Sequence, residues 1–129
     1  MIDVNKTVRT FLLAQSGITD LVGSRIYMLG LPESAVYPNL QLISDGGISN
    51  VMTPRVSPQF AVFSWGSNIA QAVELNGVVY DSLTSQNNDR HGHSIDRITN
   101  LTLSYPYEGT EDSGWRAMLS YWNFEIFND

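Results

Sequence analysis

Residues 56–83 read VSPQFAVFSWGSNIAQAVELNGVVYDSL, and this stretch decides the fold. Residues 56–65 carry apolar side chains on both faces of an extended segment. This predicts a strand whose two faces are both covered, by the protein's own helices or by a neighbour. Ser67 is a good N-cap for a helix running from residue 68 to about residue 85. The stripe that this helix turns inward is expected to consist of Ile69, Ala72, Val73, Asn76, Val79, Tyr80 and Leu83.

The residues before this stretch predict one helix and two extended pieces. Apolar spacing predicts a helix over residues 3–15, with Asp3 as its N-cap, and one further helical turn that ends at Gly23. The two extended pieces are residues 25–28 and a strand at 36–44 that has Pro38 near its start. A turn at 29–34 joins them, and a long, mobile connection at 45–54 follows the second.

The residues after the stretch predict two more strands. A polar loop at 86–94 leads to an alternating strand at 95–105, and a hairpin-like connection at 106–114 leads to the last strand at 115–127. The element order α–β–β–β–α–β–β contains no βαβ alternation and no repeat. We therefore predict a single α+β domain, residues 1–129, with two main helices packed on a mainly antiparallel sheet.

Composition excludes several classes of protein. The 129 residues contain no cysteine, which rules out disulfides and thiolate chemistry. The balance of seven Lys plus Arg against thirteen Asp plus Glu gives a net charge of −6, and the basic residues are scattered. A protein that binds nucleic acid normally has a clustered basic face, so we expect that this protein does not bind DNA through its phosphates. No secretory signal or membrane span is evident in the sequence.

The junction VFSWGSN tests for a serine hydrolase. The nucleophile elbow G-x-S-x-G would place Ser64 as the nucleophile and Gly66 as its second glycine. Val62 then stands at the first glycine, where the strained turn leaves no room for a side chain. The motif is therefore absent, and we predict that the protein is not an enzyme.

Two other groups have weak metal-site patterns. His91 and His93 form an H-x-H pair that zinc could use with a third ligand, but they also fit an ordinary solvated loop. Glu108, Glu111 and Asp112 lack the carboxylate spacing of a calcium loop. The glycines of the 45–54 segment are not followed by Gly-Lys-Ser/Thr, so no phosphate cradle is encoded. We expect no metal and no cofactor.

Three pieces of the chain, in order, resemble the tail terminator (tail completion) proteins of long-tailed phages. They are FLLAQSGITDLVGSRIY with YPNLQL, then FAVFSWGSNIAQAVELNGVVYDSL, then DSGWRAMLSYWNFEIF. The resemblance covers nearly the whole chain. The approach HGHSIDRITN to the fourth strand and the few basic residues depart from the family pattern.

The resemblance implies a structural virion protein at the junction of head and tail, assembled in the host cytoplasm. It implies a homo-oligomeric ring, typically hexameric, that stops polymerisation of the tail tube. The implied partners are the major tail tube protein and the head-connector or stopper protein, and no membrane. In this picture, strand edges and loops dock neighbouring subunits. The expected interface residues are Arg25, Tyr27, Tyr37, Ser49, Asn50, Met52 and Arg55.

Charge adds one expectation, and two other readings remain open. Carboxylates that face a central channel would repel phosphates and let genomic DNA pass without specific binding. The alternatives are another neck protein, such as a head–tail adaptor or stopper, and a generic protein-binding module.

Overall fold

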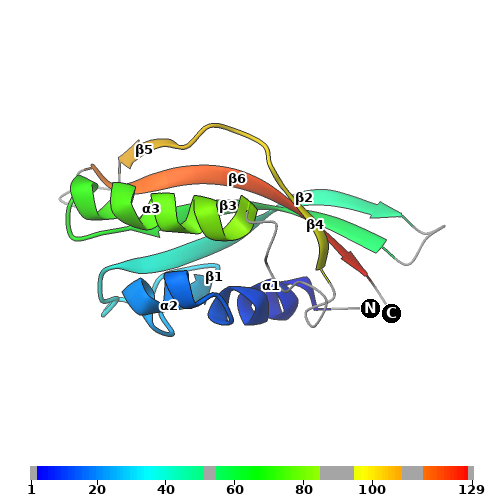
Figure 1. The fold of residues 1–129 in the computed structure, drawn as a ribbon, viewed down its shortest axis with the longest axis horizontal. Coiled ribbons are helices and arrows are strands. Elements are labelled where there is room, and N and C mark those ends of the chain that lie inside the picture. Colours follow the sequence, from blue (N-terminus) through cyan, green and yellow to red (C-terminus); the bar gives the residue numbers. More distant parts are fainter. Residues whose placement is uncertain (1–2, 51–54, 85–94, 109–114, 128–129) are drawn as a thin grey trace.

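The computed structural model describes residues 3–50, 55–84, 95–108 and 115–127. Three helices pack on one face of a six-stranded sheet, which confirms the α+β prediction (Figure 1). The elements are α1 (Val4–Leu13), α2 (Ser16–Val22), β1 (Ile26–Met28), β2 (Asn39–Asn50), β3 (Arg55–Trp65), α3 (Ile69–Thr84), β4 (Ile95–Asn100), β5 (Tyr105–Glu108) and β6 (Trp115–Phe127).

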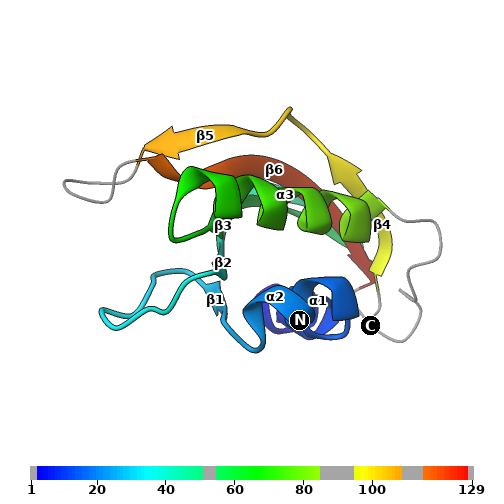
Figure 2. The same cartoon turned by 60° about the vertical axis from the view of Figure 1, so that its left-hand side comes forward.

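The sheet is mainly antiparallel, as expected. The strand order is β1–β2–β3–β6–β4, and β5 also pairs with β6. β1 and β2 are parallel, and the other pairs are antiparallel. β4 and β5 follow one another along the same side of β6, and the sheet curves around α3 (Figure 2).

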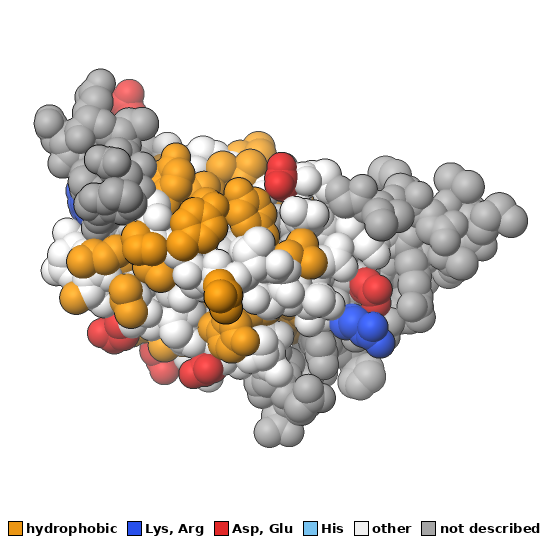
Figure 3. All heavy atoms as spheres, turned by 90° about the horizontal axis from the view of Figure 1, so that it is seen from above, with side chains coloured by type: hydrophobic (Ala, Val, Ile, Leu, Met, Phe, Trp, Pro, Cys, Tyr) orange, Lys and Arg blue, Asp and Glu red, His pale blue; other side chains and the backbone are white. Residues whose placement is uncertain are grey.

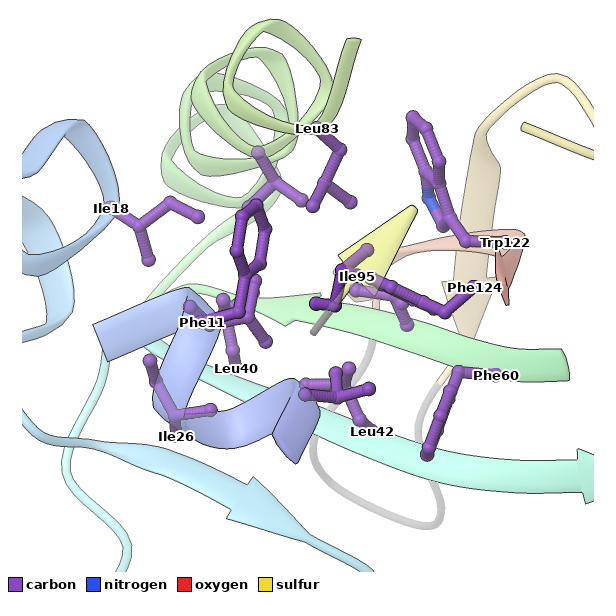
Figure 4. Close-up of a cluster of buried hydrophobic side chains, with 14 of the residues drawn as sticks. Phe11, Ile18, Ile26, Leu40, Leu42, Phe60, Leu83, Ile95, Trp122 and Phe124 are labelled. Atoms are coloured by element: carbon purple, nitrogen blue, oxygen red, sulfur yellow. The ribbon is translucent and has the colours of Figure 1, made fainter. Parts of the chain in front are cut away.

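The core lies between the helices and the sheet. α1 contributes Phe11 and α3 contributes Leu83 to one buried cluster, which also contains the sheet residues Phe60 and Trp122 (Figure 4). The rings of Phe60 and Phe124 pack edge to face, with centroids 5.7 Å apart. Burial of this apolar surface is the main favourable term that holds the layers together.

Helix ends follow the sequence in part. The Asp3 carboxylate accepts the Lys6 backbone N–H at 3.1 Å, which confirms it as the cap of α1. The prediction of Ser67 as the cap of α3 is wrong. The Asn68 side chain accepts the backbone N–H of Gln71 at 2.9 Å, while the Gln71 side chain accepts the N–H of Ser67 at 2.6 Å. Asn68 takes the cap because its oxygen reaches the free amide three residues on.

Several strand boundaries differ from the prediction, and β2 begins at Asn39 rather than at residue 36. The connection expected at 45–54 is wrong for residues 45–50, because β2 continues to Asn50 through a register shift between Ser44 and Gly47. Gly46 adopts φ +85° at this bulge, a conformation that glycine takes at little cost. The strand expected at 95–105 is interrupted at residues 101–104. β5 then spans Tyr105–Glu108, so the connection expected at 106–114 is wrong for residues 106–108.

Candidate assembly surfaces

The sheet face opposite the helices, which we call the open face, carries an uncharged row of side chains from edge to edge. The register pairs Tyr27 with Gln41, Gln41 with Phe63, Phe63 with Leu119, and Leu119 with Tyr105. Residues directly opposite one another in paired strands point to the same face. An uncharged, aromatic surface of this kind has the composition of the centre of a protein interface.

Aromatic rings next to this row pack against one another. Trp65 and Phe63 are stacked with centroids 6.2 Å apart, and Tyr107 meets Phe63 edge to face at 4.9 Å. The Trp65 indole N–H donates to the Gln41 side-chain oxygen at 2.9 Å. Leu119 is only 4% exposed among these rings. The rings are therefore held in place before any partner arrives, which lowers the entropy cost of docking.

Two tyrosines interact on the same face. Tyr121 and Tyr105 are hydrogen-bonded through their side chains, and this bond raises the pKa of Tyr121, with partial burial as a further cause. Both effects favour the neutral, protonated form of Tyr121. The pair adds polar atoms to a surface that otherwise presents ring faces.

The structure brings two of the predicted interface residues to this face. Tyr27 begins the row, and the Tyr37 ring lies 6.4 Å from Trp65. Arg25 has a different position. Its Nε donates to the Pro38 carbonyl at 2.9 Å and its terminal nitrogen to the Leu21 carbonyl at 3.4 Å. Arg25 thus links α2 to the segment before β2.

The outer edge of β1 is partly used within the chain. The Arg9 guanidinium donates from Nε to the Ile26 carbonyl at 2.9 Å, and the Ile26 N–H donates to the Ser24 carbonyl at 2.8 Å. Alternate residues of a strand turn their backbone groups to the same side. Ile26 and Met28 therefore both turn their backbone groups to the outer edge of β1. Because the groups of Ile26 are already used, the Met28 backbone is the part of this edge to which a neighbouring strand could hydrogen-bond.

The remaining predicted interface residues belong to the far end of the β2–β3 hairpin. Ser49 pairs with Val56, and Asn50 pairs with Arg55, so these positions are strand rather than loop. Met52 lies outside the described residues. Figure 1 shows this end of the hairpin reaching beyond α1 and α3.

Sequence reasoning missed an exposed apolar surface on α3. Ile69, Val73 and Tyr80 were expected to face inward but are 37%, 50% and 44% exposed, while Leu75, absent from the predicted stripe, is buried. The available signal was the excess of apolar residues over what one helix face can bury. A second group of hydrophobic side chains is visible when the molecule is seen from above, on the side of β5 and the 101–104 connection (Figure 3). The exposed large hydrophobic residues of this segment are Leu101, Leu103 and Tyr105.

The residues of the weak catalytic and metal-site patterns do not form a site within the described residues. Ser64 is fully buried inside β3, opposite Met118, so it does not stand on a strand-to-helix turn. His91 and His93 lie outside the described residues, as do Glu111 and Asp112. Within the described ranges, no group of three or more His, Asp or Glu is placed to hold a metal ion. None of the helices described is long and apolar enough to cross a membrane.

Comparison with models of protein families and with curated protein sequences gives no match. Comparison with solved structures gives matches over nearly the whole chain. A chain from the virion of a native gene transfer agent particle aligns with a TM-score of 0.62 and 16% identity, over 93% of this chain and 91% of that chain. The gp17 protein of bacteriophage SPP1 aligns with a TM-score of 0.48 and 17% identity, over 97% and 88%.

The first of these matches bears on the fold. It aligns helices and sheet together, because the aligned residues span nearly all of both chains. The sequence resemblance to tail terminator proteins led us to expect the fold of a virion protein. The chain shares its fold with a protein chain of a virion.

Proposed function

We propose that this chain is a structural, non-enzymatic virion protein that forms a ring at the head-proximal end of a phage tail. There it stops polymerisation of the tail tube and joins the tail to the head connector. The observation that carries the proposal is the fold shared with a gene transfer agent virion chain over nearly the full length of both. The ordered resemblance to tail terminator proteins makes the role specific.

The open face supports a role in assembly. Its central row is uncharged and rich in aromatic rings, which is what a protein partner covers at the centre of an interface. Trp65 and Phe63 are held by contacts within the chain, so their positions do not depend on a ligand. We propose that this face meets another virion protein, with the tail tube protein as the first partner to test.

Electron microscopy of the purified chain with tail tube protein tests the proposal. We expect capped tubes of uniform length, whereas tubes that grow without limit would contradict it. Association with tails made without heads supports a terminator, while association with heads alone supports an adaptor or stopper. A chain that joins neither would indicate a generic binding module.

The net charge of −6 fits passage of DNA through the ring without binding. Carboxylates that line the channel would keep phosphates from adhering. We expect that replacing the channel-facing Asp and Glu residues by Lys slows DNA ejection. Unchanged ejection would remove this part of the proposal.

A further inference from the structure

The outward face of α3 is apolar with an acidic border. Val73 and Tyr80 are exposed, and with Ile69 they lie along one flank of the helix at 3.6 residues per turn. One side of the Tyr80 ring packs edge to face on Trp122, with centroids 5.6 Å apart, and 44% of the side chain stays exposed. Glu74 and Asp81 are exposed beside this stripe. The sequence of α3 contains no Lys or Arg, so the charge of this face is negative.

Gly77 lies between the apolar stripe and the acidic border. A Cβ built at Gly77 would meet no atom within 4 Å, so packing within the chain does not require a glycine there. Glycine in a helix interior lowers stability relative to alanine. A missing side chain at an exposed position lets another chain come close to the helix backbone.

A second apolar surface is the arm, which we define as residues 29–38 between β1 and β2. Figure 2 shows it projecting from the sheet. Leu29 and Val36 are 57% and 58% exposed. Leu29 adopts φ +99°, which is strained for leucine, and hydrogen bonds to Leu42 and Gln41 hold its backbone. Glycine would adopt this backbone with less strain, and the Leu29 side chain is mostly exposed. Neither the backbone conformation nor the packing of the core therefore requires leucine at this position.

Two arginines contact the end of the arm, and a third contacts residues 24 and 26, on either side of Arg25. Arg25 donates to the Pro38 carbonyl, Arg116 lies over the Tyr37 ring, and Arg9 donates to the carbonyls of Ser24 and Ile26. The hydrogen bonds of Arg9 and Arg25 go to carbonyl oxygens. A carbonyl is uncharged, so these bonds do not neutralise the positive charge of the guanidinium groups. Glu33 is the one acidic residue of the arm. The arm is thus apolar with a mainly basic base, the complement of the α3 face.

We propose that the arm of one copy of this chain docks on the outward face of α3 in the next copy. Leu29 and Val36 then cover Val73 and Tyr80, and the arginines approach Glu74 and Asp81. The two surfaces differ, so the contact is head-to-tail, and such contacts close into rings when the rotation allows. This inference rests on the proposed ring function and names the contact that would build it.

Two variants test the contact by sedimentation. The first, Glu74→Arg with Asp81→Arg, keeps the arm and reverses the border of α3. The second, Leu29→Gly with Val36→Ser, keeps α3 and removes the apolar side chains of the arm, and it relieves the strain at Leu29. We expect each variant alone to associate about 30-fold more weakly than the wild type, the loss typical of interface anchors.

Mixing the two variants is the sharper experiment. One intact arm and one intact α3 face remain in the mixture, so a heterodimer should form and no ring should follow. Glu33→Arg is the matched control. It makes the same charge reversal as Glu74→Arg, but on the basic side of the contact, so assembly should persist or strengthen. Circular dichroism and thermal unfolding of each variant establish that the fold is intact.

Three results would overturn the contact. They are a wild-type chain that stays monomeric at every concentration, variants that assemble like the wild type, and a mixture that forms no heterodimer. Tube capping, scored on the same samples, separates this inference from the proposed function. Variants that still form rings and cap tubes would overturn the contact alone. A wild-type chain that assembles through the contact and leaves tubes uncapped would overturn the terminator role alone.

Discussion

The guanidinium carbon of Arg116 lies 4.2 Å from the centroid of the Tyr37 ring, so the beginning of β6 holds the end of the arm. The Nε of Arg116 also donates to the Gly66 carbonyl at 3.3 Å, and the Gly66 N–H donates to the Arg116 carbonyl at 2.8 Å. One residue therefore connects three parts of the chain that are distant in sequence: the arm, the β3–α3 turn and β6.

The contact between Arg116 and Tyr37 should be measurable by a double-mutant cycle. Tyr37→Leu removes the ring face but keeps an apolar side chain, and Arg116→Gln removes the charge. We expect a coupling free energy of about 0.5–1 kcal/mol, the range for a cation over an accessible ring. Urea unfolding of the two single variants and the double variant gives this value. A coupling within error of zero would show that the ring and the cation do not interact in solution.

Two glycines should respond to alanine with opposite signs. A Cβ at Gly66 would lie 2.6 Å from the Ala72 backbone nitrogen and 2.9 Å from the Asn68 carbonyl oxygen, so Gly66→Ala should lower the free energy of unfolding by about 2 kcal/mol. A Cβ at Gly77 meets nothing, so Gly77→Ala should raise it by about 1 kcal/mol. Chemical denaturation of the monomeric chain checks both, and equal effects at the two positions would contradict the structure.

The cap of α3 should depend on Asn68 and little on Ser67. Asn68→Ala removes the oxygen that accepts the Gln71 N–H, and we expect a loss of about 1 kcal/mol in the free energy of unfolding. Ser67→Ala keeps that bond and the backbone N–H that donates to the Gln71 side chain, so its effect should be smaller. Thermal unfolding of the two variants makes the comparison. A larger loss for Ser67→Ala would restore the assignment made from the sequence.

Stability should fall at alkaline pH because of Tyr121. Its pKa in the folded chain is raised above the ordinary value of 10.0, chiefly by the hydrogen bond with Tyr105. The folded state therefore holds the proton more tightly than the unfolded state. The resulting stabilisation is fully present below pH 10.0 and is lost as pH rises through the folded pKa.

Tyr121→Phe should reduce this alkaline loss of stability, as should Tyr105→Phe, because each removes the hydrogen bond. Unfolding by denaturant at neutral pH and just above pH 10.0 measures the effect. A wild-type chain and Tyr121→Phe with the same pH dependence would contradict the assignment.

Local patterns predicted the elements well where one residue or one period decides them. Asp3 caps α1, Gly23 ends α2 with φ +59°, and β6 spans the predicted residues 115–127. The continuation of β2 to Asn50 was missed, because Gly46 reads as a turn signal. In the sheet, pairing with β3 turns that glycine into a bulge.

The interface residues were less predictable. Tyr27 and Tyr37 each lie on or beside the open face, whereas Arg25 is used within the chain. Helix periodicity shows which residues share a side of α3, but two apolar sides compete for one sheet. The sheet covers the side with Leu75 and leaves Val73 exposed.

The sequence by itself determined the class of the fold, the order of its elements and the acidic, cysteine-free character of the chain, because these depend on local periodicity and composition. Only the tertiary structure decided which apolar residues remain exposed and which polar groups are used internally. Strand register set the row from Tyr27 to Tyr105, and register arises from pairing between residues distant in the chain. Surfaces available for assembly are what remains after those long-range pairings are satisfied, so no local pattern could specify them.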